Sequence, residues 1–212
     1  MCLSPRRKSR RRCHHEPHHP PLKLTINGEA VGPVDVPEGL PMIAFLHEYQ
    51  NLTGSRLGCG IGECRACVVL VDDASGSKEM RTCITGAHYF DGKSVRTIEG
   101  IARAANAKGA AAAGTAAPAP AGAPRKVIPL APVQQKYLEH FSFQCGYCTP
   151  GFVIGATALL ERLARNPIAS ADVEKTISDA LGTHLCRCTG YVRYFSAVKD
   201  VILNTPGYTT KG

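Results

Sequence analysis

Hydrophobic and polar residues alternate in the N-terminal part of the chain, which is the pattern of strands with one buried face. Residues 22–26 show this alternation, and the Asn27-Gly28 pair that follows is a strong signal for a tight hairpin turn. Pro41 suits the first turn of a short helix. The pattern predicts a small mixed sheet crossed by this helix, with strands over residues 22–26, 30–36, 66–71, 81–89 and 94–98.

Beyond Pro132 the hydrophobic residues recur every three or four positions, which is the period of an amphipathic helix. Four helices are expected there, and the last spans about 191–203. Thr149 can cap the second helix, Asn166-Pro167 ends it, and Ser170 can cap the third. The stripes expected to be buried are Val133, Tyr137, Leu138 and Phe141 in the first helix; Phe152, Val153, Ala156, Leu159, Leu160 and Leu163 in the second; Val173, Ile177 and Leu181 in the third; and Phe195, Val198 and Ile202 in the fourth.

A change of composition separates the two patterns. The segment between them is mostly Ala, Gly and Pro, and it has too little surface to bury to offset the entropy of ordering it. We therefore interpret it as a linker. The sequence predicts five segments: a disordered basic tail at 1–20, a sheet-containing domain at 21–101, the linker at 102–131, a helical domain at 132–205 and a C-terminal tail at 206–212.

The formal net charge of +8 is concentrated in the first tail. Six of the positive charges fall within residues 6–12, and setting them aside leaves +2 on the remainder. A short basic run can touch nucleic acid or anionic lipid, but it is more often a solvated arm. We therefore expect no nucleic-acid partner. No apolar stretch approaches the length needed to cross a bilayer, so we expect no transmembrane segment.

The ten cysteines are clustered rather than scattered. Eight fall in two compact sets of four, and only Cys2 and Cys13 are left over, both in the basic tail. Disulfide frameworks do not require such clustering, whereas metal sites do. The grouping therefore favours two metal or iron–sulfur centres over a disulfide-bonded scaffold.

The first set consists of Cys59, Cys64, Cys67 and Cys83. Its C-x4-C-x2-C spacing with a more distant fourth cysteine is that of plant-type [2Fe–2S] ferredoxins. The same loop contains Gly58, Gly60 and Gly62. Glycines allow a positive φ and a close backbone approach, so that successive N–H groups can face a negatively charged cluster. Zinc is the lesser alternative, because structural zinc prefers paired C-x2–4-C knuckles.

The second set consists of Cys145, Cys148, Cys186 and Cys188. A C-x2-C pair followed by a C-x-C pair is compatible with zinc as well as with an iron–sulfur cluster. Cys148 directly precedes an expected helix, whose N-terminus offers unpaired N–H groups and a positive dipole end. This environment favours either kind of thiolate site. From the residues alone both alternatives stay open, with [2Fe–2S] preferred.

In this order the two motifs resemble the iron–sulfur subunit of the xanthine oxidase family of molybdenum hydroxylases. The resemblance covers about residues 22–100 and 132–204. It implies an α+β fold, with a plant-ferredoxin-like β-grasp domain followed by a four-helix bundle that carries the second cluster. The residues that carry it are Cys59-Gly60-Ile61-Gly62-Glu63-Cys64-Arg65-Ala66-Cys67, Gln144-Cys145-Gly146-Tyr147-Cys148-Thr149-Pro150-Gly151 and Cys186-Arg187-Cys188-Thr189-Gly190-Tyr191.

The resemblance also implies an electron-transfer role within a larger complex. The cluster of the helical domain would be proximal to a molybdopterin in a large partner subunit, with Gln144 and Cys148 close to the pterin. The cluster on the first set would be distal and would pass electrons to FAD or to the haem of a cytochrome c subunit. The expected substrate is an aldehyde, with an N-heterocycle as the alternative. It would be oxidised in the large subunit, so no catalytic residue is expected in this chain.

Two departures from the family pattern matter. Arg65 stands where many members have Gly, and it would either influence the distal cluster or an acceptor, or face solvent. The long linker resembles that of the branch, including membrane-bound bacterial aldehyde dehydrogenases, that passes electrons to a membrane-anchored cytochrome c subunit. This resemblance implies a membrane-associated complex on the periplasmic face of the inner membrane, with a cytoplasmic complex as the alternative. The competing interpretations of the chain are a free-standing two-cluster ferredoxin and a binding module with structural zinc.

Overall fold

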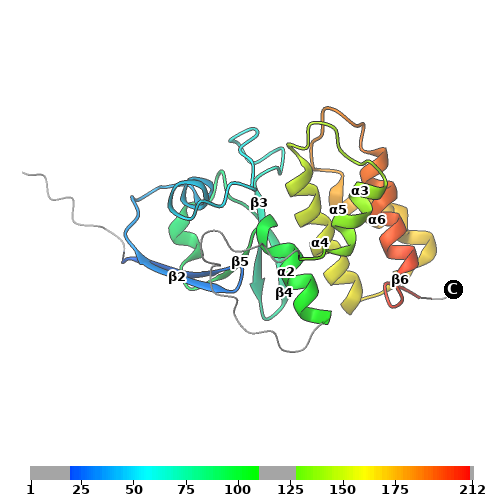
Figure 1. Ribbon diagram of the computed structural model, residues 1–212, viewed down its shortest axis with the longest axis horizontal. Coiled ribbons are helices and arrows are strands. Elements are labelled where there is room, and N and C mark those ends of the chain that lie inside the picture. The colour runs from blue at the N-terminus through cyan, green and yellow to red at the C-terminus, as the bar shows by residue number, and fades with distance from the viewer. Residues whose placement is uncertain (1–19, 110–127, 211–212) are drawn as a thin grey trace, which may run out of the picture.

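The computed structural model describes residues 20–109 and 128–210, which form a mixed sheet on one side and a group of helices on the other (Figure 1). The strands are β1 Leu22–Ile26, β2 Glu29–Val34, β3 Val68–Asp73, β4 Gly76–Arg81, β5 Ser94–Arg96, β6 Ile168–Ala169 and β7 Thr209–Thr210. The α-helices are α1 Met42–Ala44, α2 Ile98–Gly109, α3 Pro132–Glu139, α4 Thr149–Arg165, α5 Val173–Leu181 and α6 Val192–Asn204. Shorter helical turns are the π-helix η1 Phe45–Tyr49 and the 3-10 helices η2 Ala87–Phe90 and η3 Ser170–Asp172. Across the two described ranges, no helix is long and apolar enough to span a membrane.

Five strands form one sheet in the order β2-β1-β5-β3-β4, in an α+β arrangement as expected. β1 runs parallel to β5, and the other neighbouring strands are antiparallel. Asn27, with a φ of 53°, and Gly28, with a φ of 87°, both adopt the left-handed conformation that a type I′ hairpin turn requires. The predicted turn between the first two strands is therefore confirmed. The short helix after Pro41 covers one face of the sheet and buries Met42, Ile43, Phe45 and Leu46.

The strand predicted over residues 81–89 is wrong. The chain forms β4 earlier, at Gly76–Arg81, as a hairpin with β3, and it then makes the 3-10 turn η2. The hydrophobic pattern does not predict β4, because this edge strand consists mostly of polar residues. The hairpin with β3 imposes its pairing. In η2 the buried residues Ala87 and Phe90 are three positions apart, which is the period of a 3-10 helix rather than of a strand.

Part of the linker predicted over residues 102–131 is helical instead. Residues 102–109 belong to α2, because alanine has the highest intrinsic helix propensity and Ile101 anchors the helix in the core. Residues 110–127 of the predicted linker lie outside the described residues, and so do residues 1–19 of the basic tail and residues 211–212. From residue 128 the chain leads directly into α3.

Most of the residues predicted to be buried in the four helices are buried in the structure. The predicted core residues of the second and third helices are all buried, and α4 ends before Asn166. In the first helix Leu138 and Phe141 are instead 46% and 74% exposed. Leu138 follows the buried Tyr137 directly and so lies about 100° round the helix from it, whereas Phe141 comes after the end of α3 at Glu139. Neither predicted cap forms. Cys148 occupies the N-cap position of α4, and Ser170 is the first residue of η3. Neither helix has a side-chain hydrogen bond at its N-cap.

Stacked aromatic rings form the centre of the helical half. Tyr194 of α6 lies parallel to Phe152 of α4 with ring centroids 4.1 Å apart, and the edge of Tyr137 meets Tyr194 at 5.0 Å. The Thr149 hydroxyl, which does not cap the helix, lies 2.6 Å from the Tyr194 hydroxyl. Tyr194 was missed in the sequence, although its spacing from the buried residues Ala197, Val198 and Val201 fits one face of a helix.

Strand β3 connects the two halves because both of its faces are buried. Val69 and Val71 point into the core of the sheet, whereas Val68 and Leu70 point into the core of the helical half. The strand therefore reads as a continuous apolar run, as strands covered on both faces do. α4 lies against β3 and β4, with α5 and α6 on its far side (Figure 1). The two cysteine-bearing halves are thus packed as one body.

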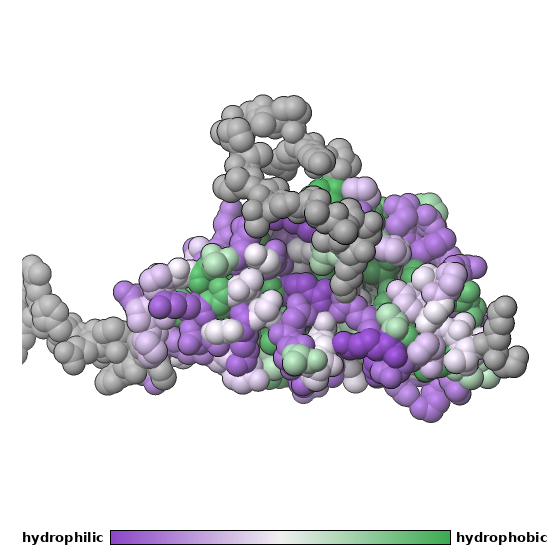
Figure 2. Space-filling model, turned by 90° about the horizontal axis from the view of Figure 1, so that it is seen from below, coloured by the Kyte–Doolittle hydropathy of each residue, from purple (hydrophilic) through white to green (hydrophobic). Residues whose placement is uncertain are grey.

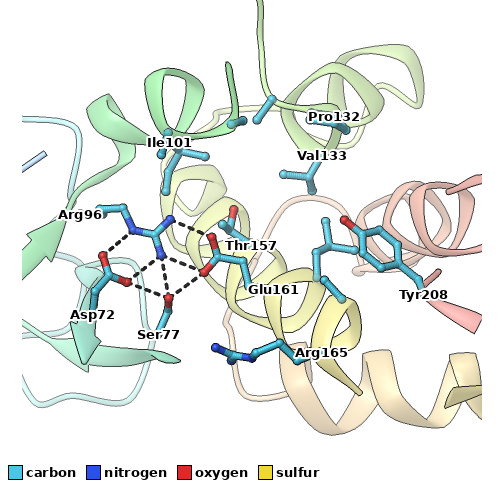
Figure 3. Close-up of a pocket in the computed structure, with 15 residues that line it drawn as sticks. Asp72, Ser77, Arg96, Ile101, Pro132, Val133, Thr157, Glu161, Arg165 and Tyr208 are labelled. Atoms are coloured by element: carbon cyan, nitrogen blue, oxygen red, sulfur yellow. Dashed lines mark hydrogen bonds and ion pairs between the residues drawn. The ribbon is translucent and has the colours of Figure 1, made fainter. Parts of the chain in front are cut away.

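A charged network joins the same two halves at some distance from the cysteines. The Arg96 guanidinium of β5 donates to Asp72 of β3 at 2.7 Å and to Glu161 of α4 at 2.8 Å, and Ser77 of β4 completes the network (Figure 3). Burial alone would lower the pKa of Arg96, but the two carboxylates outweigh it and raise the pKa. The network forms the polar wall of a cavity of about 680 Å³ between α2 and α4.

Removal of Arg96 should therefore weaken the packing of α4 on the sheet. In Arg96→Ala the carboxylates of Asp72 and Glu161 would lose the guanidinium that lies between them, and we expect a loss of about 2 kcal/mol in the free energy of unfolding. Arg103→Ala is the matched control, because Arg103 pairs with Glu29 in an exposed position and should cost at most about 0.5 kcal/mol. Urea unfolding followed by circular dichroism measures both. Equal midpoints for the two variants would contradict the role assigned to Arg96.

Candidate iron–sulfur centres

The first cysteine set converges at one end of the sheet. Cys59, Cys64 and Cys67 lie in the loop that leads from η1 to β3, and Cys83 follows β4. The backbone N–H of Cys64 lies 3.4 Å from the Cys59 sulfur, and the thiols of Cys67 and Cys83 interact with each other. The four cysteines predicted to form one site are therefore neighbours in space, and the hairpin β3-β4 is the element that returns Cys83 to the loop.

The backbone of this loop requires its glycines. Gly60 and Gly62 have φ values of 72° and 81°, in the left-handed region that side chains disfavour. Gly58 is needed for space, because a Cβ atom there would lie 2.9 Å from the sulfur of Cys64. Arg65 also has a positive φ, of 58°, which gives a physical reason why glycine suits this position.

Backbone donors prepare the first set to carry negative charge. The N–H groups of Cys64, Ile61 and Glu63 point at the Cys59 sulfur, and they lower the pKa of this thiol to about 6. Burial acts in the opposite direction at Cys83, whose pKa rises to about 11. A thiolate is the form that binds metal, so bound iron would have to supply the charge that stabilises the Cys83 thiolate.

The second set lies between the helices. Cys145 and Cys148 occupy the turn before α4, and Cys186 and Cys188 occupy the connection from α5 to α6. The sulfurs of Cys145 and Cys188 are 3.5 Å apart and both residues are exposed, whereas Cys186 is buried and interacts with Cys148. This set therefore has an inner pair and an outer pair, and the outer pair reaches the surface.

The inner pair is held by hydroxyl groups. The Thr189 hydroxyl lies 3.1 Å from the Cys186 sulfur, and the Tyr194 hydroxyl lies 3.6 Å from the Cys148 sulfur. Burial raises the pKa of Cys148 to about 11. At Cys186 burial also acts to raise the pKa, but Thr189 and nearby backbone N–H groups outweigh it, and the pKa falls below its usual value. Thr189 and Tyr194 are thus polar neighbours that the cysteine spacing did not reveal.

The thiols of both sets are arranged in pairs. Cys59 interacts with Cys64 and Cys67 with Cys83, and in the second set Cys148 interacts with Cys186 and Cys145 with Cys188. This arrangement fits a [2Fe–2S] cluster, because each tetrahedral iron takes two protein thiolates beside the two bridging sulfides. Within residues 20–109 and 128–210, no three His, Cys, Asp or Glu side chains are placed to hold a single metal ion.

The two sets lie next to each other. The N–H of Leu185, one residue before Cys186, donates to the carbonyl oxygen of Cys64 at 3.1 Å. The Tyr147 hydroxyl, between Cys145 and Cys148, donates to the carbonyl of Leu57 at 2.9 Å. Gly151 of α4 permits this approach, because a Cβ atom there would lie 2.3 Å from the Arg65 carbonyl oxygen. Backbone groups of the two cysteine loops are therefore in direct contact.

The remaining residues singled out from the sequence are also placed. Gln144 is exposed and directly precedes Cys145 of the outer pair. Arg65 neither lies free in solvent nor reaches outward, because its guanidinium pairs with Glu79 of β4 at 3.2 Å. His184 is buried, and its Nε2 lies 3.3 Å from the same carboxylate. Glu79 was not singled out from the sequence, because nothing in a polar edge strand marks one carboxylate among others.

Comparison with known proteins supports two cluster-binding regions. Residues 24–93 match the model of the 2Fe-2S iron-sulfur cluster binding domain, and residues 121–199 match that of the [2Fe-2S] binding domain. The chain is 34% identical to the xanthine dehydrogenase iron-sulfur-binding subunit of Escherichia coli O157:H7, over 84% of the chain and 92% of that subunit. It is 35% identical to the nicotine 6-hydroxylase small subunit of Paenarthrobacter nicotinovorans, over 76% of the chain and 75% of that subunit.

Solved structures give the same relationship. The chain superposes on quinoline 2-oxidoreductase from Pseudomonas putida 86 with a TM-score of 0.62 and 28% identity, covering 88% of this chain and 91% of that chain. It also superposes on the aldehyde oxidoreductase from Desulfovibrio gigas with a TM-score of 0.63 and 29% identity, where it covers 90% of this chain and 18% of the longer protein. The second superposition aligns this chain with a part of a larger polypeptide.

The crowding at Gly58 gives a selective test of the first site. In Gly58→Ala the added methyl group would displace the Cys64 sulfur, so the first cluster should be lost while the second is retained. Iron should fall from about four to about two atoms per chain. Gly86→Ala is the control, because its Cβ would find only ordinary contacts, and it should keep all the iron. Full iron content in Gly58→Ala, measured by plasma emission spectrometry, would contradict the proposed packing.

Proposed function

The chain belongs to the iron–sulfur subunits of the xanthine dehydrogenase and aldehyde oxidase family of molybdenum hydroxylases, and on this premise we propose that it takes electrons from a large molybdopterin-binding subunit and delivers them to a separate acceptor. When bound, the two [2Fe–2S] clusters each accept and release one electron at a time. The residues of the chain hold the cysteine pairs, shield the inner pair of the second set and present the outer pair to a partner.

The observation that carries this proposal is the exposed position of the second set. Cys145 and Cys188 reach the surface beside the exposed Gln144. Two large apolar side chains on the elements that flank this set, Phe141 and Val192, are 74% and 69% exposed. Exposed apolar side chains of this size favour a protein interface over free solvent. We therefore assign this surface to the large subunit, with Gln144 nearest the pterin. Cys148, which the resemblance also places near the pterin, belongs to the inner pair.

The first set would be the exit for electrons. Ile61 and Ile84, which belong to the loops of this set, are 69% and 55% exposed, and Leu57 is exposed nearby. An apolar rim around a cluster allows close, transient docking of an acceptor without a large interface. The acceptor would be FAD in another subunit or the haem of a cytochrome c subunit. The periplasmic, membrane-associated location expected from the resemblance stays a prediction.

For the substrate, we place an N-heterocyclic compound ahead of an aldehyde. Three of the relatives that the chain covers over most of their length are named for xanthine, nicotine or nicotinate. The chain covers only 12% of the rat aldehyde oxidase 1, which is a much longer protein. An arrangement with a separate small subunit therefore supports N-heterocycle hydroxylation, and aldehyde oxidation remains the second candidate.

The proposal is tested by reduction of the clusters in the purified complex. Nicotinate or xanthine, mixed anaerobically with the wild-type complex, should bleach the cluster absorbance faster than benzaldehyde does. In Gln144→Ala both clusters should remain, but bleaching should slow at least about tenfold, because the residue nearest the partner cofactor no longer fixes the contact. Gln135→Ala, an exposed glutamine on α3, is the matched control and should behave as the wild type.

The opposite results are equally clear. An unchanged bleaching rate in Gln144→Ala would contradict the assignment of this surface to the large subunit. Clusters that no added substrate can reduce in the intact complex would contradict the electron-transfer proposal itself. Faster bleaching by the aldehyde would reverse the order of the two substrate classes.

A further inference from the structure

One carboxylate lies between the two cysteine loops without belonging to either. Glu79 of β4 pairs with Arg65 at 3.2 Å and with His184 at 3.3 Å, both through the same oxygen, Oε2. Arg65 lies between the ligand candidates Cys64 and Cys67, and His184 lies two residues before Cys186. The carboxylate therefore contacts both loops: it forms an ion pair with Arg65 in the loop of the first set, and it lies 3.3 Å from the His184 Nε2 in the loop of the second.

Glu79 is held in an ionised state by this position. Burial acts to raise its pKa, but the interactions with His184 and Arg65 outweigh burial and keep the pKa below its usual value. The side chain of Glu79 is 18% exposed and that of Arg65 is 25% exposed, so solvent screens these contacts less than it would on an open surface.

His184 has no room to find another partner. Its side chain is 1% exposed and lies against the Phe152 ring, with 5.2 Å between the ring centroids. Gly155 of α4 makes space for it, because a Cβ atom there would lie 2.6 Å from Nε2. Neither ring nitrogen makes a well-aligned hydrogen bond to any described residue, so the nearby carboxylate of Glu79 is the group that compensates its burial.

The same place holds the closest backbone link between the two sets. The Leu185 N–H donates to the Cys64 carbonyl at 3.1 Å, and these residues are direct neighbours of His184 and Arg65 in the chain. We infer that Glu79 is a positioning residue that clamps the two cysteine loops together through Arg65 and His184 and so fixes the spacing of the two clusters. The clamp gives a role to the arginine that this chain has at a position whose positive φ suits glycine.

The inference rests on the proposed electron-transfer function, because a fixed spacing matters for a relay. The clamp can nevertheless be measured without electron transfer, because it should protect the Leu185 amide against hydrogen exchange. In Glu79→Ala, with iron bound, the peptide that contains Leu185 should exchange at least about fivefold faster than in the wild type. With both clusters reduced, the magnetic splitting that each imposes on the EPR signal of the other should also weaken or broaden.

Two further variants separate the clamp from general damage to the fold. Arg65→Gly removes the guanidinium at a backbone position that accepts glycine, so it should raise Leu185 exchange without lowering the unfolding midpoint. Glu161→Gln alters the ionic link between α4 and the sheet at Arg96, which does not involve Arg65, Glu79 or His184, and should leave Leu185 exchange unchanged.

The results that would overturn the inference follow from this design. Wild-type protection of Leu185 in both Glu79→Ala and Arg65→Gly would show that the clamp does not exist. An equal rise in Glu161→Gln would show that any weakening of the packing of α4 has the same effect. A wild-type EPR splitting in Arg65→Gly would remove the role in spacing the clusters. None of these measurements depends on substrate turnover. A failure of the clamp can therefore be told apart from a failure of the proposed function, which the bleaching rate of Gln144→Ala tests.

Discussion

Eight thiols must be held as close pairs, although thiolates repel one another, and the rest of the structure serves this constraint. The chain meets it by drawing each set from two separate segments and by surrounding the sulfurs with donors. Three backbone N–H groups face Cys59, and the Thr189 and Tyr194 hydroxyls face the inner pair of the second set. Burial and the neighbouring thiol raise the pKa of both Cys83 and Cys148, so bound iron would have to supply the charge that stabilises their thiolates.

The second requirement is that both sites keep a fixed relation to each other. β3 is apolar on both faces and joins the core of the sheet to that of the helices. Gly151 lets α4 approach the backbone of the first cysteine loop, and the Leu185 N–H bonds directly to Cys64. Arg96 ties the sheet to Glu161 of α4 (Figure 3), and Glu79 lies between Arg65 of the first cysteine loop and His184 before α6. The space-filling view of another face shows mixed polar and apolar residues over this packed body (Figure 2).

The sequence predicted what depends on local spacing. The two cysteine sets, the hairpin at Asn27-Gly28 and the buried stripe of α4 follow from short motifs and a helical period. The sequence could not reveal β4, because a polar edge strand takes its pairing from its neighbour. It also could not reveal that Arg65 and His184 share Glu79, because Arg65 meets Glu79 only through the pairing of β4, and His184 belongs to the other half of the chain. Contacts between residues far apart in the chain leave no local pattern, so the clamp is visible only in the folded chain.

The central claim is that both thiol sets hold [2Fe–2S] clusters, and metal content tests it most directly. Protein purified without oxygen should contain about four iron atoms per chain and no stoichiometric zinc, with two distinguishable EPR signals after reduction. Two iron atoms with one zinc atom would contradict the account, because the second set would then be a structural zinc site and the chain could not act as a two-cluster relay.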